Sequence, residues 1–149
     1  MEISIYNDLL NELEFGELEQ KLMGMPFNVM EDIINRLAFD PIKEESNLLV
    51  YTFLYGLLCK HETSKLHFLI SKLMGVTLNH ISNAESIGLY HGLQASRLDP
   101  DNIDILEYLL YYNQIPEKPL SDQIAISFAR QIIDKRPQSI VAKMRIGLY

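Results

Sequence analysis

The sequence lacks the features that mark exported or membrane-spanning proteins. Its one cysteine, Cys59, cannot form an internal disulfide, so nothing in the chain requires an oxidising compartment. The longest uncharged apolar stretch, residues 48–59, has twelve residues, whereas a bilayer requires about twenty. The first ten residues are acidic, unlike the basic start of a secretory signal. We therefore expect a soluble, cytoplasmic protein in which Cys59 is a buried apolar side chain.

The sequence also lacks the motifs of common catalytic sites. No serine lies in a nucleophile-elbow motif, and no glycine-rich loop follows a strand. The histidines do not show the spacing of a zinc helix, and we interpret them as structural or surface residues. We therefore expect a protein that is not an enzyme and that holds no metal or other cofactor. The four histidines are His61, His67, His80 and His91.

A calcium loop is the sharpest metal hypothesis, and it fails on its spacing. An EF-hand that starts at Asp99 places Ile103 where an oxygen ligand is needed. It also places Leu110 where the bidentate glutamate should stand. The acidic segment after Asp99 is therefore better explained as the start of a helix.

Charge is distributed unevenly along this acidic chain, whose net charge is −7. Residues 1–45 contain eleven acidic and three basic residues, whereas residues 118–149 have a net charge of +4. The acidic part should repel nucleic acid and attract a basic protein. A run of acids at the start of the chain is either a solvated helix face or a docking surface for such a partner. These acids are Glu2, Asp8, Glu12, Glu14, Glu17 and Glu19.

Strand signals are nearly absent, because the chain has no alternating β-branched runs and no Asn-Gly or Asp-Gly turns. Helix signals recur throughout. The segment "KLMG" occurs at residues 21–24 and 72–75, and each copy predicts a helix end at its glycine. Predicted helix starts are Ser82 with Glu85, Asn28 with Glu31, and Ser121. The predicted helices cover residues 4–14, 17–23, 28–38, 45–60, 64–74, 83–97, 101–113, 121–135 and 138–146.

A repeat of 37 residues relates two segments of the second half of the chain. One helical hairpin cannot cover its own apolar faces, so repeats of this length predict stacked hairpins. We expect residues 1–149 to form one all-α domain, a right-handed stack of helical hairpins known as an α-α solenoid. The overlay matches Gly88 with Ala125, Gly92 with Ala129 and Pro100 with Pro137.

Residues 82–149 resemble the tetratricopeptide repeat. Small residues and a closing proline follow the steps of its second helix at Gly88, Ala95 and Pro100, and again at Ala125 and Pro137. The chain departs from the motif because the aromatic-leucine-glycine-tyrosine signature of the first helix is missing. The resemblance implies a solenoid of tetratricopeptide or HEAT type. It also implies one possible role, that of an adaptor for a peptide or a regulatory protein.

The stretch "DPDNIDILEYLLYYNQIPEKPLSDQIAISFARQIIDKRPQSIVAKM" resembles the C-terminal half of small helical immunity proteins. Those proteins neutralise bacterial polymorphic and contact-dependent toxins. The resemblance implies an immunity protein that occludes a cognate toxin domain. Nucleases must attract phosphate, so an acidic protein is complementary to a nuclease toxin. We expect a basic toxin C-terminal domain as partner, and neither nucleic acid nor membrane.

The helix predicted after Pro100 is the candidate binding surface. Asp99 is suited to cap this helix, and Pro100 to its first position. A helical wheel gives one apolar half, which must be core, and one half of acids and tyrosines. The alternative is that a neighbouring helix covers Tyr108 or Tyr112. The expected partner-binding residues are Asp101, Asp104, Glu107, Tyr108 and Tyr111.

Overall fold

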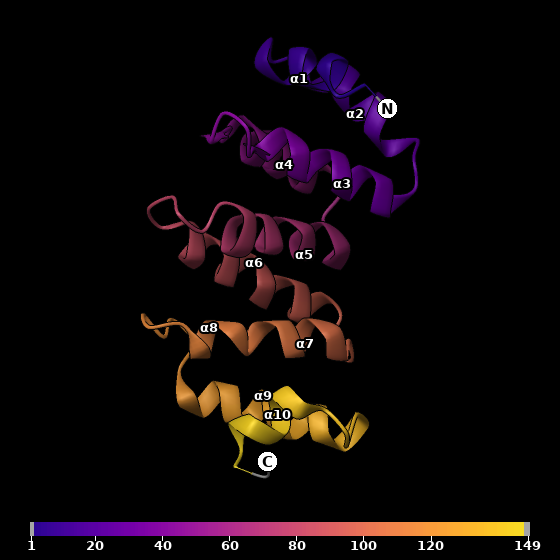
Figure 1. Cartoon of the computed structure of the whole chain (residues 1–149). Coiled ribbons are helices and arrows are strands. Elements are labelled where there is room, and N and C mark those ends of the chain that lie inside the picture. The colour runs from indigo at the N-terminus through magenta and orange to yellow at the C-terminus, as the bar shows by residue number, and fades with distance from the viewer. Residues whose placement is uncertain (1, 148–149) are drawn as a thin grey trace.

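The computed structural model describes residues 2–147, and most of them are helical (Figure 1). The helices lie in successive layers, with the two ends of the chain at opposite ends of the stack. The predicted all-α class is confirmed. The helices are α1 (Ser4–Asn11), α2 (Phe15–Met23), α3 (Phe27–Ala38), α4 (Leu49–Lys60), α5 (Ser64–Lys72), the π-helix η1 (Leu73–Thr77), α6 (Ala84–Leu98), α7 (Ile103–Leu109), α8 (Tyr111–Gln114), α9 (Asp122–Lys135) and α10 (Ile140–Arg145).

The first four helices begin and end close to their predicted positions, with two local exceptions. α1 ends at Asn11 because Leu13 adopts a φ of 62°, which a helix cannot accommodate. A short antiparallel hairpin, β1 (Phe39–Asp40) and β2 (Glu45–Ser46), occupies the predicted start of α4. The Asp40 carboxylate accepts hydrogen bonds from the two amides after Pro41, and this turn delays the helix.

The middle of the molecule is a close pair of helices, α5 and α6. The predicted helix end at Gly75 is wrong, because the chain continues through η1, where the Leu78 amide donates to the Leu73 carbonyl at 2.8 Å. Gly75 is instead a packing residue, since a Cβ there would overlap the hydroxyl of Tyr112. The glycine of this second "KLMG" is therefore needed for tertiary contact, whereas Gly24 does follow the end of α2.

The 37-residue register holds in the last helices. α7 and α10 begin 37 residues apart, and each is capped by the residue before it. Asn102 accepts from the Ile105 amide, and Ser139 accepts from the Ala142 amide. The matched small residues are all buried. These are Gly88 with Ala125, and Gly92 with Ala129.

Several predicted helix caps are wrong, although Ser121 does cap α9. Asn102 caps α7 in place of Asp99, which lies at the end of α6. Asn83, with a φ of 67°, directly precedes α6 and displaces the predicted capping box at Ser82. Asn28 lies inside α3, which begins just after Pro26. In each case a neighbouring turn residue fixes the helix start.

Cys59 is exposed, contrary to the prediction that it is buried. α4 buries one face, and Cys59 falls outside it, beside the exposed Lys60. Within residues 2–147, no helix has both the length and the apolar character needed to cross a membrane. The buried side chains of α4 are Val50, Phe53, Leu54, Leu57 and Leu58.

Candidate binding site

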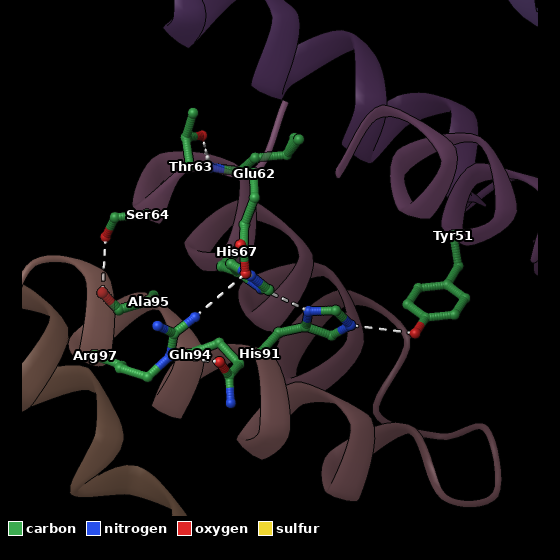
Figure 2. A network of polar contacts seen from close by, with 10 residues as sticks. Tyr51, Glu62, Thr63, Ser64, His67, His91, Gln94, Ala95 and Arg97 are labelled. Atoms are coloured by element: carbon green, nitrogen blue, oxygen red, sulfur yellow. Dashed lines mark hydrogen bonds and ion pairs between the residues drawn. The ribbon is translucent and has the colours of Figure 1, made fainter. Parts of the chain in front are cut away.

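A chain of polar side chains, with two buried histidines at its centre, links α4, α5 and α6 (Figure 2). His67 of α5 and His91 of α6 are both buried, and their Nδ1 atoms are 2.9 Å apart. His91 shares one side of α6 with Gly88, Gly92 and Ala95, at spacings of three and four residues. Because these three neighbours are glycine or alanine, α5 can approach this side of α6 closely enough for the two imidazoles to meet.

The histidine pair continues at both ends. His67 Nε2 lies 3.0 Å from a carboxylate oxygen of Glu62, which is exposed and also lies 3.4 Å from Arg97. His91 Nε2 lies 3.1 Å from the hydroxyl of Tyr51. We call these four residues, Tyr51, His91, His67 and Glu62, the histidine chain. It connects the exposed carboxylate of Glu62 with the hydroxyl of Tyr51 on α4 (Figure 2).

One arrangement of protons satisfies the whole histidine chain. An ionised carboxylate can only accept, so His67 donates to Glu62 from Nε2, and its Nδ1 can then accept from His91. His91 then donates from Nδ1 and accepts at Nε2 from the Tyr51 hydroxyl. Both imidazoles are neutral in this arrangement, and every ring nitrogen has a partner. The histidine chain is therefore a rigid, fully bonded unit.

The electrostatic environment shifts the pKa values of His91, Glu62 and Tyr51. Burial, reinforced by the charge that His67 can acquire, lowers the pKa of His91 to about 4. The hydrogen bond from His67, aided by the charges of His67 and Arg97, lowers the pKa of Glu62. Burial, with the neighbouring tyrosines, raises the pKa of Tyr51. At neutral pH His91 is thus uncharged, Glu62 ionised and Tyr51 protonated.

Three tyrosines surround the ring of His91 and reach the surface. Ring centroids of Tyr51, Tyr55 and Tyr90 lie 5.8, 6.4 and 5.0 Å from that of His91, in edge-to-face geometry. Tyr55 is 47% exposed and Tyr90 is 55% exposed. We call Tyr51, Tyr55 and Tyr90 the aromatic face. It combines exposed aromatic area with hydrogen-bonded polar side chains beneath it.

A second buried polar cluster lies one helical turn beyond His67. Ser71 donates to the carbonyl of Gly88 at 2.5 Å, and its Oγ is 2.9 Å from the hydroxyl of Tyr108. The hydroxyls of Tyr108 and Tyr112 are 2.7 Å apart. Burial strongly raises the pKa of Tyr108 and also raises that of Tyr112. This cluster joins α5, α6 and the α7–α8 segment.

The predicted binding residues do not form one exposed surface. Tyr112 is fully buried, and Tyr108 is held in the serine cluster. Tyr111 is partly covered and packs against Tyr112, with ring centroids 5.2 Å apart. Tyr108 is partly covered, and its hydroxyl is held by Ser71 and Tyr112, so its role in partner binding stays a prediction. The alternative of a covering neighbour holds for Tyr112.

The acids of the same predicted site pair with the end of α9. Asp101 accepts from Lys135 at 2.6 Å, and Asp104 accepts from Arg136 at 3.0 Å. Glu107 accepts from Arg136 at 2.9 Å and from Ser139 at 2.7 Å. Part of the positive charge of residues 118–149 thus neutralises acids of the same chain. Asp101 and Asp104 remain exposed, so their role in partner binding stays a prediction.

The acids at the start of the chain lie mainly on the surface. Within this group, Glu19 is partly covered and pairs with Lys60 at 2.8 Å. Over residues 2–147 the structure has no group of three or more His, Cys, Asp or Glu side chains that could hold a metal ion. The candidate site is therefore the aromatic face with the histidine chain beneath it.

Sequence reasoning missed the pairing of His67 with His91. One signal was present: His91 lies in the small-residue stripe of α6, a position that faces the neighbouring helix. Nothing in a single sequence connects it with a histidine 24 positions earlier on another helix. Tyr51 and Tyr55 lie within the apolar run of residues 48–59, which was considered only as a segment too short to cross a membrane.

Comparisons with known proteins assign no function. No protein-family model matches the sequence, and the comparisons with curated proteins and with solved structures gave no match. A functional proposal therefore depends on the geometry and charge of the chain itself.

Proposed function

We propose that this protein is a stoichiometric binding protein, not an enzyme, and that a protein partner docks on the aromatic face. The observation that carries the proposal is the exposure of Tyr55 and Tyr90 around a buried, hydrogen-bonded histidine. Tyrosine is enriched in binding hot spots because it brings a large contact area with few rotatable bonds. A tyrosine hydroxyl can also replace a contact with water by a contact with the partner.

Rigidity beneath the aromatic face supports the same function. Tyr51 is tied to His91, and His91 is tied through His67 to Glu62. A surface that is already ordered loses little conformational entropy when a partner binds. The histidine chain would therefore act as the fixed base of the binding site, without contacting the partner through its buried members.

The charge of the molecule favours a basic partner. The chain has a net charge of −7, and the segment that leads into α4 carries Asp40, Glu44 and Glu45. Exposed acids of this kind accelerate association with a positively charged surface and contribute less to its specificity. The tyrosines would supply most of the binding free energy, and the acids the rate of encounter.

We further propose that the helices form a right-handed α-α solenoid of tetratricopeptide or HEAT type. The 37-residue correspondence between the α6–α7 and α9–α10 pairs supports this architecture. In that arrangement α4 and α6 would present equivalent faces of successive hairpins, and the aromatic face would lie across two repeats.

The specific role that we propose is that of a cytoplasmic immunity protein. Its partner would be a basic bacterial toxin domain, for example a nuclease, whose substrate site the protein occludes. The resemblance of residues 99–144 to immunity proteins and the acidic charge support this role. A tetratricopeptide-like adaptor for a regulatory protein is the alternative that the experiment must separate.

Site-specific photocrosslinking tests the proposal. Tyr90 is replaced with p-benzoylphenylalanine, and the exposed Ile140 of α10 serves as the control position. The crosslinked partner is identified and purified, and its affinity is measured for the parent, Tyr55→Ala, Tyr90→Ala and Ile140→Ala. We expect a loss of about 2 kcal/mol or more in each tyrosine variant and little change in the control.

Co-expression with the captured domain then separates the two roles. A toxic domain whose toxicity is suppressed by the parent and not by the tyrosine variants supports the immunity role. A non-toxic regulator that binds through a short peptide favours the adaptor. Equal crosslinking at positions 90 and 140, or unchanged affinity in both tyrosine variants, would contradict docking on the aromatic face.

A further inference from the structure

A pocket opens among α2, α3, α4 and α5, and its lining includes no residue of the aromatic face. Its volume is 250 Å³, and its lining is mainly apolar. The lining includes Phe27 and three methionines, Met23, Met25 and Met30. Methionine side chains adapt to the shape of an apolar ligand because they are unbranched and polarisable. The pocket can thus accept an apolar chain without a preformed exact fit.

The polar residues that line this pocket are His61, Thr63 and Lys65, and no acidic residue is among them. The Lys65 ammonium lies over the ring of Phe27, 5.8 Å from its centroid. Lys65 has no carboxylate partner within residues 2–147, whereas nearby Lys60 is paired with Glu19. An acidic protein thus keeps an unpaired cation beside an apolar pocket, which favours a ligand with a negative head.

The start of α5 adds hydrogen-bond donors at the same place. Thr63 caps α5 by accepting from the Leu66 amide. The amides of Ser64 and Lys65 have no hydrogen-bond acceptor among residues 2–147. Free amides at a helix start attract anions through their N–H groups and the helix dipole. Thr63, Lys65 and Leu66 all line the pocket, so this helix start borders it.

We infer that the pocket binds a small anionic amphiphile, a medium-chain carboxylate whose chain fills the pocket and whose carboxylate pairs with Lys65. A pocket of 250 Å³ has room for a short apolar chain. Octanoate, with its carboxylate at the rim beside Lys65, is the probe of this class. The inference is independent of the proposed protein partner, because the pocket shares no residue with the aromatic face.

Methionine methyl NMR gives a direct test, because methionines lie both inside and outside the pocket. The whole protein is labelled with [ε-¹³C]methionine and titrated with sodium octanoate below its micelle concentration. We expect saturable shifts for Met23, Met25 and Met30. Met74, buried in η1, and Met144, exposed on α10, serve as internal controls and should not shift.

Matched ligands test separately the contributions of the apolar chain and of the negative charge. Octanol has the chain without the charge, acetate the charge without the chain, and N-acetyl-leucinamide imitates an apolar side chain of a protein partner. We expect octanoate to bind most tightly. Octanol binding as tightly as octanoate would overturn the anionic part of the inference. Binding of N-acetyl-leucinamide without binding of octanoate would assign the pocket to a partner's side chain and overturn it entirely.

Two variants complete the test. Lys65→Gln should weaken octanoate binding about tenfold, as expected for the loss of a charged hydrogen bond. Lys143→Gln, at a basic residue of α10, should leave it unchanged. Met25→Trp should block the pocket, and unfolding curves will show whether this variant folds. Lys65→Gln with parental affinity, or shifts of Met144 as large as those of Met25, would overturn the inference.

Discussion

His91 is the central residue of the histidine chain. Its imidazole joins α6 to α5 through His67 and to α4 through Tyr51. Its imidazole is buried between these helices, and burial favours the uncharged form of the ring. The stability of the protein should therefore respond to the protonation of this side chain.

The first prediction is a loss of stability in mild acid. The folded pKa of His91 is about 4 and its ordinary value is 6.5, so the unfolded chain binds more protons between these values. The contribution of His91 is thus complete above pH 6.5 and is lost as the pH falls towards 4. The pKa of Glu62 is lowered from 4.5 in the folded protein, so its contribution to stability is also lost as the pH falls below that value. Urea unfolding at pH 7.5 and 4.5 measures the effect.

The variant His91→Gln isolates this contribution. We expect it to reduce the difference in unfolding free energy between the two pH values by about 2 kcal/mol. His61→Gln is the control, because His61 is exposed and has no side-chain hydrogen bond among the described residues. An identical pH dependence in the parent and His91→Gln would show that His91 does not carry the effect.

At the scale of the elements, the contact between α5, α6 and α7 depends on missing side chains. A Cβ on Gly92 would lie 2.7 Å from Leu109 Cδ2 and 2.9 Å from Ser71 Oγ. Ala129 occupies the matching position of α9 and is fully buried. Gly56 of α4, in contrast, has open space where its Cβ would be. Packing therefore requires a glycine at position 92, whereas it does not require one at position 56.

The second prediction uses this contrast. Gly56→Ala should stabilise the protein by about 0.5–1 kcal/mol, because alanine is the better helix former. Gly92→Ala should destabilise it, since the added methyl group must displace Leu109 or Ser71. Gly92→Leu and Ala129→Leu should overpack the core by about 1–3 kcal/mol. Denaturant unfolding of the four variants measures these changes, and equal effects of the two alanine substitutions would contradict the packing described.

The acids of α7 provide the third prediction. From the helical wheel alone, Asp104 and Glu107 should both tolerate lysine, because they lie opposite the apolar stripe. The structure instead places Glu107, 22% exposed, between Arg136 and Ser139. Glu107→Lys should therefore lower the unfolding temperature by several degrees through repulsion of Arg136. Asp101→Lys, at an 84% exposed position, should change it little. Similar thermal melts for both variants would contradict this difference.

At the scale of the whole molecule, two apolar cores lie along the stack of helices. One extends from Leu9 to Ala84 and the other from Ala95 to Ala142. The α5–α6 pair lies between them and contributes to both, for example through Leu69 and Ala95. Helices at the two ends of the stack are covered on fewer sides. Local stability should follow this order.

The fourth prediction is a gradient of hydrogen exchange along the chain. Amides of α5 and α6 should exchange most slowly, because their opening requires disruption of both cores. Amides of α1 and α10 should exchange fastest among the helices, since each packs at an end of the stack (Figure 1). Native-state exchange followed by mass spectrometry measures the gradient. Uniform protection across all helices would indicate a single cooperative unit and contradict the prediction.

The helices and much of their boundaries could be predicted from the sequence, because the signals involved are local. Ser121 caps α9 through a bond to an amide three residues away. The buried small residues of α6 and α9 follow from spacing along one helix. Errors arose where two local signals compete, as at Asp99 and Asn102, or where a turn interrupts a helical pattern, as at Asp40.

The binding site could not be predicted in the same way, because tertiary contacts decide it. Periodicity places Tyr108 on the polar half of its helix, but the packing of α5 and α6 partly covers it. Composition gives the acidic charge, but the fold decides that Asp104 meets Arg136 and that Tyr55 and Tyr90 stay exposed. The sequence alone thus determined an acidic, all-helical chain with a 37-residue register, since periodicity and charge are properties of neighbouring residues. Only the tertiary structure decided which side chains meet across helices, since residues far apart in sequence become neighbours only through packing.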